Sequence, residues 1–421
     1  MAVTASAALT FMTGCTNSPS GSGGAMSGES GGSGDAVTWA STASEKAAVD
    51  EIAKKFTEKT GINVETTIAD TDNFQTTLRT QLTSGTGPDV FFAWPGQGNP
   101  MTMEVLVDAG LIADLSDYAF AKDIPDGIKP VAQVDGKTYI APLNMSVIGP
   151  AYNMTAMDEL GLSVPETWDE VLKLCKDAKG KGKAAYSLAA ATGWQTQLIP
   201  FALASTLVYQ ADPDFASKMN AGEVTFADSS WVNAMEQNLE MADAGCFQEN
   251  YLGTTYEEAL KEVSSGSALA SVQVSSSLTA ITDGAPEGTE FVFQPLPATN
   301  DASQTFIPAA AGGSYAINAN AKNPEGAKAL MEYLTSEEGI AIYTELSASI
   351  NALPAGDIEL NSALDPMIAK VDAGETYPFM DQQWPNANVQ QTLFEITQQI
   401  LAGDSSATDG LSRMDSAFKE G

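Results

Sequence analysis

The sequence predicts an α/β fold, because segments with strand character alternate with segments of helical character. The chain has 421 residues, which corresponds to two or three domains at about 150 residues each. Hydrophobic residues make up 43% of the chain and charged residues 18%, values typical of globular proteins rather than disordered ones. We therefore expect helices packed on sheets that are mostly parallel.

The first elements follow one another from residue 36 onward. Residues 36–40 have the character of a short strand, and a capping box at Thr42–Glu45 precedes a helix. Apolar side chains recur at helical spacing in this helix, and Gly61 is placed to end it. Residues 62–69 predict the next strand.

A second helix and a third strand continue the alternation. Asp72 precedes the helix, Gly85 ends it, and residues 88–94 form an apolar run typical of a buried strand. Strands joined by helices in this way are expected to run parallel. Because ligands of such sheets lie beyond the carboxyl ends of the strands, Trp39 and Trp94 both fall at or near the expected site.

The composition excludes several classes of function. The chain has no histidine, which excludes Ser-His-Asp and Cys-His catalysis, HExxH zinc sites and haem held by histidine. Its 20 Lys and Arg against 54 Asp and Glu give a net charge of −34, so nucleic acid is not an expected partner. No internal run of eighteen or more apolar residues predicts a membrane span.

The three cysteines, Cys15, Cys175 and Cys246, allow no CxxC motif and no Cys/His cluster. We therefore expect no metal site and no cofactor. Cys175 and Cys246 fall in or at the end of predicted helices, and an exported protein meets oxidising conditions. A disulfide between them is a possibility that the sequence leaves open, because it does not fix their distance.

The first 35 residues predict an export signal and a tether. Residues 1–14 are interpreted as a signal peptide, shortened at its start because no Lys or Arg precedes Cys15. The residues before Cys15 resemble a lipobox, with Met12 in place of the usual Leu, so Cys15 is the expected lipidation site. Residues 15–35 are rich in Gly and Ser, as in a flexible tether. The alternative is an unstructured tail with an incidental cysteine.

Several motifs, largely caps and turns, occur in one order from about residue 37 to the C-terminus. They are Phe56–Val64, Leu82–Val90, Gly136–Pro142, Tyr152–Asn153, Gly161–Glu170, Gly312–Gly313, Asn323–Ala327 and Leu334–Glu338. Together they resemble family 1 of the extracellular solute-binding proteins, the maltose-binding-protein-like sugar-binding lipoproteins of bacterial ABC importers.

The resemblance implies a two-lobe, periplasmic-binding-protein-like (Venus flytrap) fold, each lobe a mostly parallel sheet flanked by helices. The first lobe is expected to contain residues 36–146 and 308–350, and the second residues 147–305 and 351–421. The implied function is capture of a carbohydrate by hinge closure and its delivery to a membrane permease. The implied protein is a monomer that catalyses nothing and is anchored by lipid to the extracellular face of the bacterial membrane.

A neutral sugar offers an apolar C–H face and hydroxyl edges, so its site needs aromatic platforms and polar side chains. Trp94, Trp194 and Trp384 lie in strand-end or loop positions that match aromatic positions of the family. Trp39 is a further candidate, with a core tryptophan as the alternative. The resemblance and these residue types together predict a nearly uncharged site.

Polar candidates complete the predicted site. The side chains expected to bond the ligand are those of Glu45, Gln97, Asn144, Ser146, Gln195 and Gln273. Gly312 and Gly313 would let the backbone approach the sugar closely, with a tight turn as the alternative.

Two other functions stay open. A lipid-anchored glycoside hydrolase needs two carboxylates and no histidine, and the chain has many acids. The same fold could instead bind a polyamine or another cation, which the charge of −34 suggests.

Overall fold

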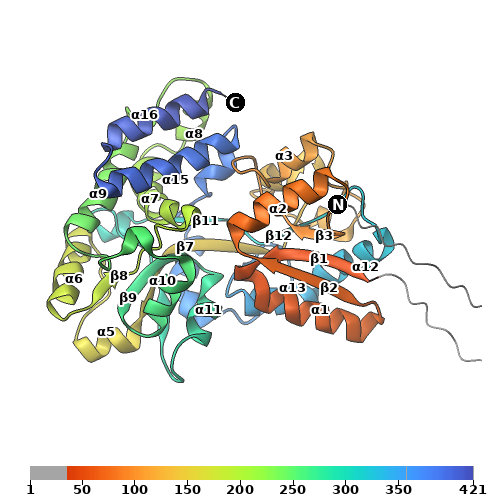
Figure 1. The fold of residues 1–421 in the computed structure, drawn as a ribbon, viewed down its shortest axis with the longest axis horizontal. Helices are drawn as coiled ribbons and strands as arrows, with labels where there is room; N and C mark the ends of the chain where they lie inside the picture. Colours follow the sequence, from red (N-terminus) through yellow and green to blue (C-terminus); the bar gives the residue numbers. More distant parts are fainter. Residues whose placement is uncertain (1–35, 357, 421) are drawn as a thin grey trace, which may run out of the picture. The chain divides into compact units, whose positions relative to one another are not determined.

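Two large β-sheets organise residues 36–356 and 358–420, which are the residues that the computed structural model describes (Figure 1). The predicted signal peptide, the lipidation site Cys15 and the Gly/Ser tether lie outside the described residues. Each sheet has its own hydrophobic core, so the two are described in turn.

One sheet has five strands in the order β2-β1-β3-β12-β6. The strands are β1 (Val37–Thr42), β2 (Val64–Ala69), β3 (Val90–Phe92), β6 (Ala141–Pro142) and β12 (Ser314–Ile317). β1 runs parallel to β2 and β3, as predicted, whereas β12 runs antiparallel to β3 and β6. The chain enters β12 directly from the other sheet without a crossover helix, and such a strand need not be parallel to its neighbours.

The other sheet has seven strands, with β7 (Asn144–Asn153) in its middle. Its other strands are β8 (Ala184–Tyr186), β9 (Ala268–Val274), β10 (Phe291–Phe293), β11 (Ile307–Ala311), β13 (Ile350–Asn351) and β14 (Thr376–Tyr377). β7 pairs antiparallel with β9, β10, β11 and β13, while β8–β9 and β11–β14 are parallel pairs. Both sheets are therefore mixed and not mostly parallel as expected, because β7 and β12 pair antiparallel with their neighbours. A separate hairpin joins β4 (Gln133–Val134) and β5 (Lys137–Thr138).

Helices cover both sheets, and Figure 1 shows α1 and α2 beside β1 and β2, with α5 and α6 near β8 and β9. The helices in the core of the five-stranded sheet are α1 (Lys46–Thr60), α2 (Thr71–Thr83), α3 (Met103–Asp108), α4 (Lys129–Ala132), α12 (Pro324–Leu334) and α13 (Glu337–Leu346). Those on the seven-stranded sheet are α5 (Met154–Leu160), α6 (Trp168–Gly180), α7 (Leu198–Ala204), α8 (Phe215–Asn220), α9 (Trp231–Asp243), α10 (Tyr256–Ser264), α11 (Ser277–Asp283), α14 (Asp365–Asp372), α15 (Ala387–Ala402) and α16 (Ala407–Phe418).

Shorter helical turns join these elements. They are η1 (Ala43–Glu45), η2 (Ala119–Lys122), η3 (Gly193–Gln197), the π-helical η4 (Ser205–Gln210), η5 (Tyr251–Gly253), η6 (Ala302–Gln304), η7 (Ser362–Leu364) and η8 (Met380–Gln383). Three of them, η1, η3 and η8, supply residues to the site described below.

The start of α1 differs from the prediction in a way that matters for the site. The predicted capping box at Thr42–Glu45 is wrong, because Thr42 caps no backbone N–H and the turn η1 precedes the helix. Glu45 points instead to a buried hydroxyl, that of Tyr343. The helix ends where predicted, at Gly61, whose φ of +75° is a conformation that glycine adopts without strain.

Within the described residues, the chain passes between the two sheets three times. The crossings lie at Leu143, at Gly312–Gly313 and at residues 347–349, between the end of α13 and β13. Residues 308–311, expected in the first lobe, pair within the seven-stranded sheet as part of β11. Ala352, Leu353 and Ala355, expected in the second lobe, lie in the core of the five-stranded sheet. Three short crossings beside one another are the arrangement from which a hinge can be built.

The side chain of Asn144 joins all three crossings. It is fully buried directly after the first crossing, and its Oδ1 accepts a hydrogen bond from the backbone N–H of Gly313 at 2.5 Å. Its Nδ2 donates to Oγ of Ser347 in the third crossing at 3.3 Å. Both polar groups of Asn144 are therefore used inside the protein, which accounts for a buried amide at this place.

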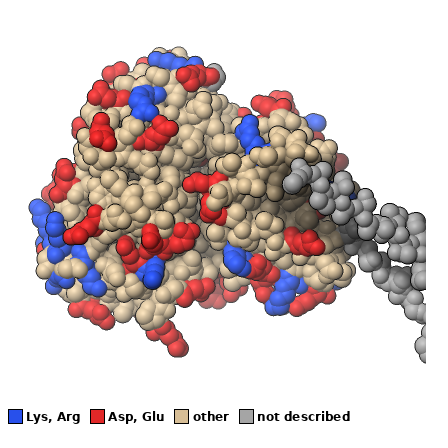
Figure 2. Space-filling view, viewed as in Figure 1, with Lys and Arg blue, Asp and Glu red and all other residues tan. Residues whose placement is uncertain are grey.

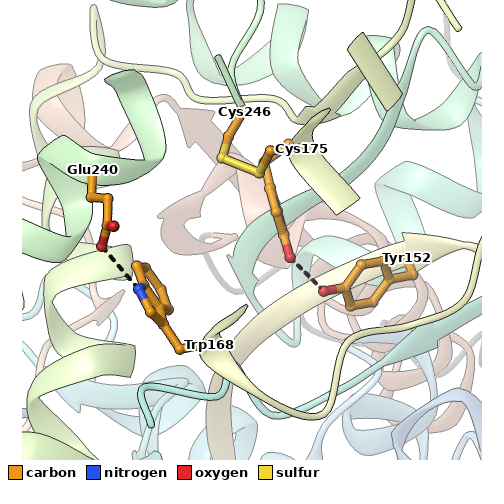
Figure 3. The surroundings of a disulfide bond; sticks show 6 residues. Tyr152, Trp168, Cys175, Glu240 and Cys246 are labelled. Carbon is orange, nitrogen blue, oxygen red and sulfur yellow. Dashed lines mark hydrogen bonds between the residues drawn. A yellow bond between two sulfur atoms is a disulfide. The ribbon is translucent and has the colours of Figure 1, made fainter. Parts of the chain in front are cut away.

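Cys175 and Cys246 form a disulfide that links α6 to the short turn just after α9 (Figure 3). Both residues are fully buried. Nearby, the hydroxyls of Tyr152 and Tyr186 lie 2.7 Å apart, and Nε1 of Trp168 donates to Oε2 of Glu240 at 2.9 Å. The bond thus lies inside the core of the seven-stranded sheet.

Replacing both cysteines, Cys175→Ala with Cys246→Ala, is expected to lower the free energy of unfolding. The bond closes a loop with a sequence separation of 71 residues. In the chain-entropy model, losing a loop of that length costs about 4 kcal/mol. Urea unfolding followed by circular dichroism measures the difference, and a reductant should destabilise the wild type without affecting the variant. Equal unfolding midpoints of variant and wild type would contradict the expectation.

Candidate functional site

A cavity of about 120 Å³ lies at the carboxyl ends of β1, β2 and β3. Residues at or just after the end of each strand line it: Thr42, Ser44 and Glu45 for β1, Thr71, Asp72 and Gln75 for β2, and Trp94, Pro95 and Asn99 for β3. This is the edge at which ligands of parallel sheets bind. The cavity therefore lies where the strand order leads one to expect a site.

The seven-stranded sheet and its helices form the opposite wall. The lining residues on this side are Ser146, Ile148, Trp194, Gln197, Leu198, Phe201, Val274, Ser276, Phe379, Asp381, Gln382, Gln390 and Phe394. Ala311, Gly312 and Gly313, at the second crossing, complete the lining. The cavity thus lies between the two sheets and directly beside the crossings.

Aromatic side chains dominate the apolar part of the lining. They are Phe92, Trp94, Trp194, Phe201, Phe379 and Phe394. The ring of Trp94 packs edge-on against Phe92, with centroids 4.7 Å apart, and Trp194 lies 5.1 Å from Tyr256. Trp94 and Trp194 are only half-buried, so each ring is held by neighbours and still has free surface.

Trp194 also borders a second hollow of about 210 Å³. Ser44, Thr71 and Asp72 line both spaces, so the hollow adjoins the cavity. Trp194 therefore borders both spaces.

Glu45 is the buried carboxyl group on the side of the five-stranded sheet. Its Oε2 accepts a hydrogen bond from the hydroxyl of Tyr343 at 2.6 Å, and its Oε1 accepts one from Ser44 at 3.3 Å. Burial raises the pKa of Glu45, and the hydrogen bonds from Tyr343, Ser44 and Ser276 oppose the rise. These hydrogen bonds therefore fix the position of the carboxyl group, but they do not fully offset the cost of burying its charge.

Asp381 is the buried carboxyl group of the opposite wall. Its Oδ2 accepts a hydrogen bond from Nε2 of Gln390 at 2.9 Å, and the same nitrogen donates to Oε1 of Gln197 at 3.2 Å. Its Oδ1 has no hydrogen-bond partner. Burial raises the pKa of Asp381 from 3.8 to about 7, and the nearby backbone N–H groups of Asp381 and Gln382 oppose the rise.

The site is more acidic than we expected from the sequence. Glu45, Asp72 and Asp381 all line the cavity, and its lining contains no Lys or Arg. The pKa of Asp72 is also raised, by burial and by the neighbouring charge of Asp70. Of these three carboxyl groups the sequence predicted only Glu45, and burial favours the neutral forms of Glu45 and Asp381 by raising their pKa values.

A loop after β3 lies against the wall that carries Asp381. A Cβ atom on Gly98 would lie 1.7 Å from the carbonyl oxygen of Asp381, and one on Gly96 would lie 2.3 Å from that of Gln382. Gly96 also has a φ of +74°. Only glycine permits this approach of the two backbones, so the loop and the turn η8 meet across the site.

Six of the predicted site residues line the cavity, and six do not. Those that line it are Glu45, Trp94, Ser146, Trp194, Gly312 and Gly313. Those that lie elsewhere are Trp39, Gln97, Asn144, Gln195, Gln273 and Trp384. Contact of any of them with a ligand remains a prediction.

The six residues outside the lining are held by protein neighbours. Trp39 is fully buried against Tyr315, and Trp384 packs edge-on to Phe201 and Phe226.

The amides among these six have partners of their own. Gln195 and Gln273 bond to each other through both side chains, and the Gln97 side chain bonds to Glu104. Asn144 is the amide that joins the crossings. These contacts account for the four amides without a ligand.

The sequence analysis did not predict the polar residues from the C-terminal part of the chain that line the cavity. Asp381, Gln382 and Gln390 all line the cavity, and Gln197 joins them from η3. The local signal for this wall is the run of polar residues next to Trp384, but residue type alone favours the tryptophan as the ligand contact.

A model of the bacterial extracellular solute-binding protein family matches residues 39–341. The chain belongs to this family. The multiple sugar-binding protein of Streptococcus mutans is 28% identical over 334 residues, which are 77% of this chain and 76% of that protein. The predicted family is therefore confirmed, and membership implies an extracellular location.

Solved structures of other solute-binding proteins share the fold. RafE in complex with raffinose has a TM-score of 0.73 at 24% identity, covering 91% of this chain and 99% of RafE. A sugar transporter of Bacillus licheniformis in complex with stachyose has a TM-score of 0.73 at 18% identity, covering 91% of this chain and 100% of that one. The two-lobe α/β fold predicted from the sequence is thus confirmed.

Two further features of this solute-binding protein concern membranes and metals. Among the described residues, no helix combines the length and the apolar character needed to cross a membrane. Within the same ranges, no three His, Cys, Asp or Glu side chains are grouped so that they could hold a metal ion.

The variant Asp381→Asn is expected to change how stability depends on pH. Folded Asp381 keeps its proton up to a pKa of about 7, whereas the unfolded residue loses it near 3.8. Between these values the unfolded state binds fewer protons, so wild-type stability falls as pH rises, by about 1.4 kcal/mol per pH unit at most.

Thermal melts of ligand-free protein from pH 5 to pH 8 measure this effect. Glu45 and Asp72 titrate in both proteins, so the difference between wild type and variant isolates Asp381. The wild type should lose stability relative to Asp381→Asn as pH rises. A difference that stays constant across this range would contradict the assignment.

Proposed function

We propose that this protein captures an oligosaccharide in the cavity between its two sheets and delivers it to the permease of an ABC importer. The observation that carries the proposal is the lining itself: six aromatic rings together with carboxyl, amide and hydroxyl groups. Aromatic faces stack on the apolar C–H face of a sugar, and the polar groups bond its hydroxyls. Carboxylates form strong, charge-assisted hydrogen bonds of this kind with neutral donors.

The relatives support a carbohydrate as the class of ligand. The Streptococcus mutans relative is named a multiple sugar-binding protein, and the two structural neighbours hold raffinose and stachyose. The adjoining hollow beside Trp194 favours a chain of sugar units over a single ring.

Capture requires that the two lobes separate and close. The cavity of about 120 Å³ is smaller than the several hundred cubic ångströms typical of ligand sites. We propose that the lobes divide at the three crossings and that rotation there opens the site. The loop of Gly96 and Gly98 would then leave Asp381 and return when the ligand is bound.

The tether and the anchor belong to the same proposal. Cys15 as the lipidated residue would keep the protein, as a monomer, near its permease at the outer face of the membrane. Figure 2 shows Asp and Glu side chains scattered over the visible surface with fewer Lys and Arg among them. A solvated acidic surface of this kind suits an exported protein and does not require a cationic partner.

A cationic ligand is the second candidate, and the carboxyl groups favour it. Glu45, Asp72 and Asp381 line the cavity without a Lys or Arg to balance them. A polyamine would supply the missing positive charge. The aromatic lining is the reason for ranking the sugar first.

A panel of ligands tests the proposal. Thermal shift followed by calorimetry with raffinose, stachyose, maltotriose, chitotriose and spermidine should show binding of at least one oligosaccharide and none of spermidine. No new reducing ends should appear during incubation, because we propose that the protein catalyses no hydrolysis. Tight spermidine binding without any sugar binding would overturn the proposal in favour of the cation, and released sugar would favour the hydrolase.

Trp194→Ala should weaken binding of the selected oligosaccharide on the order of tenfold to a hundredfold, since stacked aromatic rings dominate such sites. Tyr139→Ala is the matched control, because Tyr139 is also a half-buried aromatic but does not line the cavity. Calorimetry at one temperature compares both variants with the wild type. Equal affinities of Trp194→Ala and the control would show that Trp194 is not a platform.

A further inference from the structure

Two buried oxygen atoms in the wall of the cavity have no hydrogen-bond donor. They are Oδ1 of Asp381 and Oε1 of Gln382. Only 6% of Asp381 and 7% of Gln382 are exposed, and both residues line the cavity. Buried acceptors are almost always paired. Other buried polar atoms of the described residues are also unpaired, but these two belong to residues that line the cavity, so a ligand can supply their donor.

The remaining polar atoms of both side chains are anchored. Oδ2 of Asp381 accepts from Nε2 of Gln390, and Nε2 of Gln382 donates to the carbonyl oxygen of Ala311 at 2.9 Å. Ala311 is the last residue of β11, directly before the second crossing. These bonds fix the orientation of the side chains, so neither unpaired oxygen can turn to another partner without breaking a bond.

The loop after β3 closes over the same turn. Gly96 and Gly98 lie so close to the backbone of Gln382 and Asp381 that no side chain fits between them. In this arrangement both unpaired oxygens are buried out of reach of bulk water. Closure without a ligand therefore leaves two acceptors unsatisfied, which makes the closed state unfavourable.

We propose that Asp381 and Gln382 form a paired acceptor that determines specificity by requiring two neighbouring donors on the ligand. This inference rests on the proposed function. On a sugar, the matching group is a vicinal diol, two hydroxyls on adjacent carbon atoms. A ligand that lacks one of these hydroxyls leaves a buried acceptor unpaired and is rejected.

Variants of the two residues separate recognition from folding. Asp381→Leu and Gln382→Met remove the acceptors while keeping roughly the side-chain volume. At pH 8, where Asp381 is ionised, affinity for the oligosaccharide selected from the panel should fall about a hundredfold for Asp381→Leu and about tenfold for Gln382→Met. If Asp381→Leu does not fold, the same affinity measurement is made with Asp381→Asn, which puts a donor in place of one acceptor.

Gln383→Met is the matched control. Gln383 lies on the same turn, η8, and its Oε1 accepts from the hydroxyl of Tyr377 at 3.1 Å, but it does not line the cavity. Its substitution should leave the affinity unchanged. A loss for this variant equal to that of Gln382→Met would overturn the proposal.

Thermal melts without ligand supply the readout that distinguishes recognition from a structural role. Asp381→Asn keeps an oxygen for the hydrogen bond from Gln390 and removes the unpaired acceptor, so its melting temperature at pH 8 should be unchanged or higher. A lower melting temperature together with the lower affinity would show that Asp381 holds the fold, which contradicts the proposal.

Monodeoxy analogues of the selected oligosaccharide complete the test. Two adjacent hydroxyls should each contribute at least tenfold to wild-type affinity, and each contribution should disappear in one of the two variants. Losses that persist in both variants would overturn the paired acceptor while leaving the proposed function intact. Binding of no saccharide by a folded wild type would instead refute the proposed function.

Discussion

The three crossings between the sheets are the constraint on which the site depends. Asn144 bonds to the other two crossings through its side chain, to Gly313 in one and to Ser347 in the other. A Cβ atom on Gly313 would lie 2.1 Å from the hydroxyl oxygen of Tyr343, which itself donates to Glu45. The three crossings are thus linked through Tyr343 to Glu45 in the cavity. Packing at the crossings therefore fixes the position of this part of the cavity lining.

The cavity next to the three crossings contains groups that destabilise the closed, ligand-free protein. Burial raises the pKa values of Glu45 and Asp381, and no basic residue lines the space. Buried carboxyl groups without a basic partner and an unpaired amide oxygen make the closed state energetically unfavourable without a ligand. A protein that must release its ligand to a permease benefits from such a balance, because closure then depends on what is bound.

The sequence was sufficient for features that local patterns determine. Helical spacing and Gly61 located α1, and the strand pattern placed Trp94 at the carboxyl end where the cavity lies. The same pattern placed Trp39 there, but Trp39 is buried in the core. Local patterns failed where distant segments meet. Gln197 and Gln390 lie 193 residues apart yet bond to each other, and Gln195 and Gln273, both expected to bind ligand, satisfy each other instead. Residue type identified sugar-binding chemistry, but only the fold shows which amides are free to use it.

The most direct test of this account is the distance between the lobes with and without sugar. Spin labels at Thr77→Cys on α2 and Lys261→Cys on α10, both exposed positions on opposite sides of the cavity, report that distance in pulsed electron resonance. A Cys15→Ser background leaves Cys175 and Cys246 paired. We predict a broad, longer distribution without ligand and a single shorter distance with a saturating oligosaccharide. An identical distribution in both conditions, with binding verified by calorimetry, would contradict closure as the means of capture.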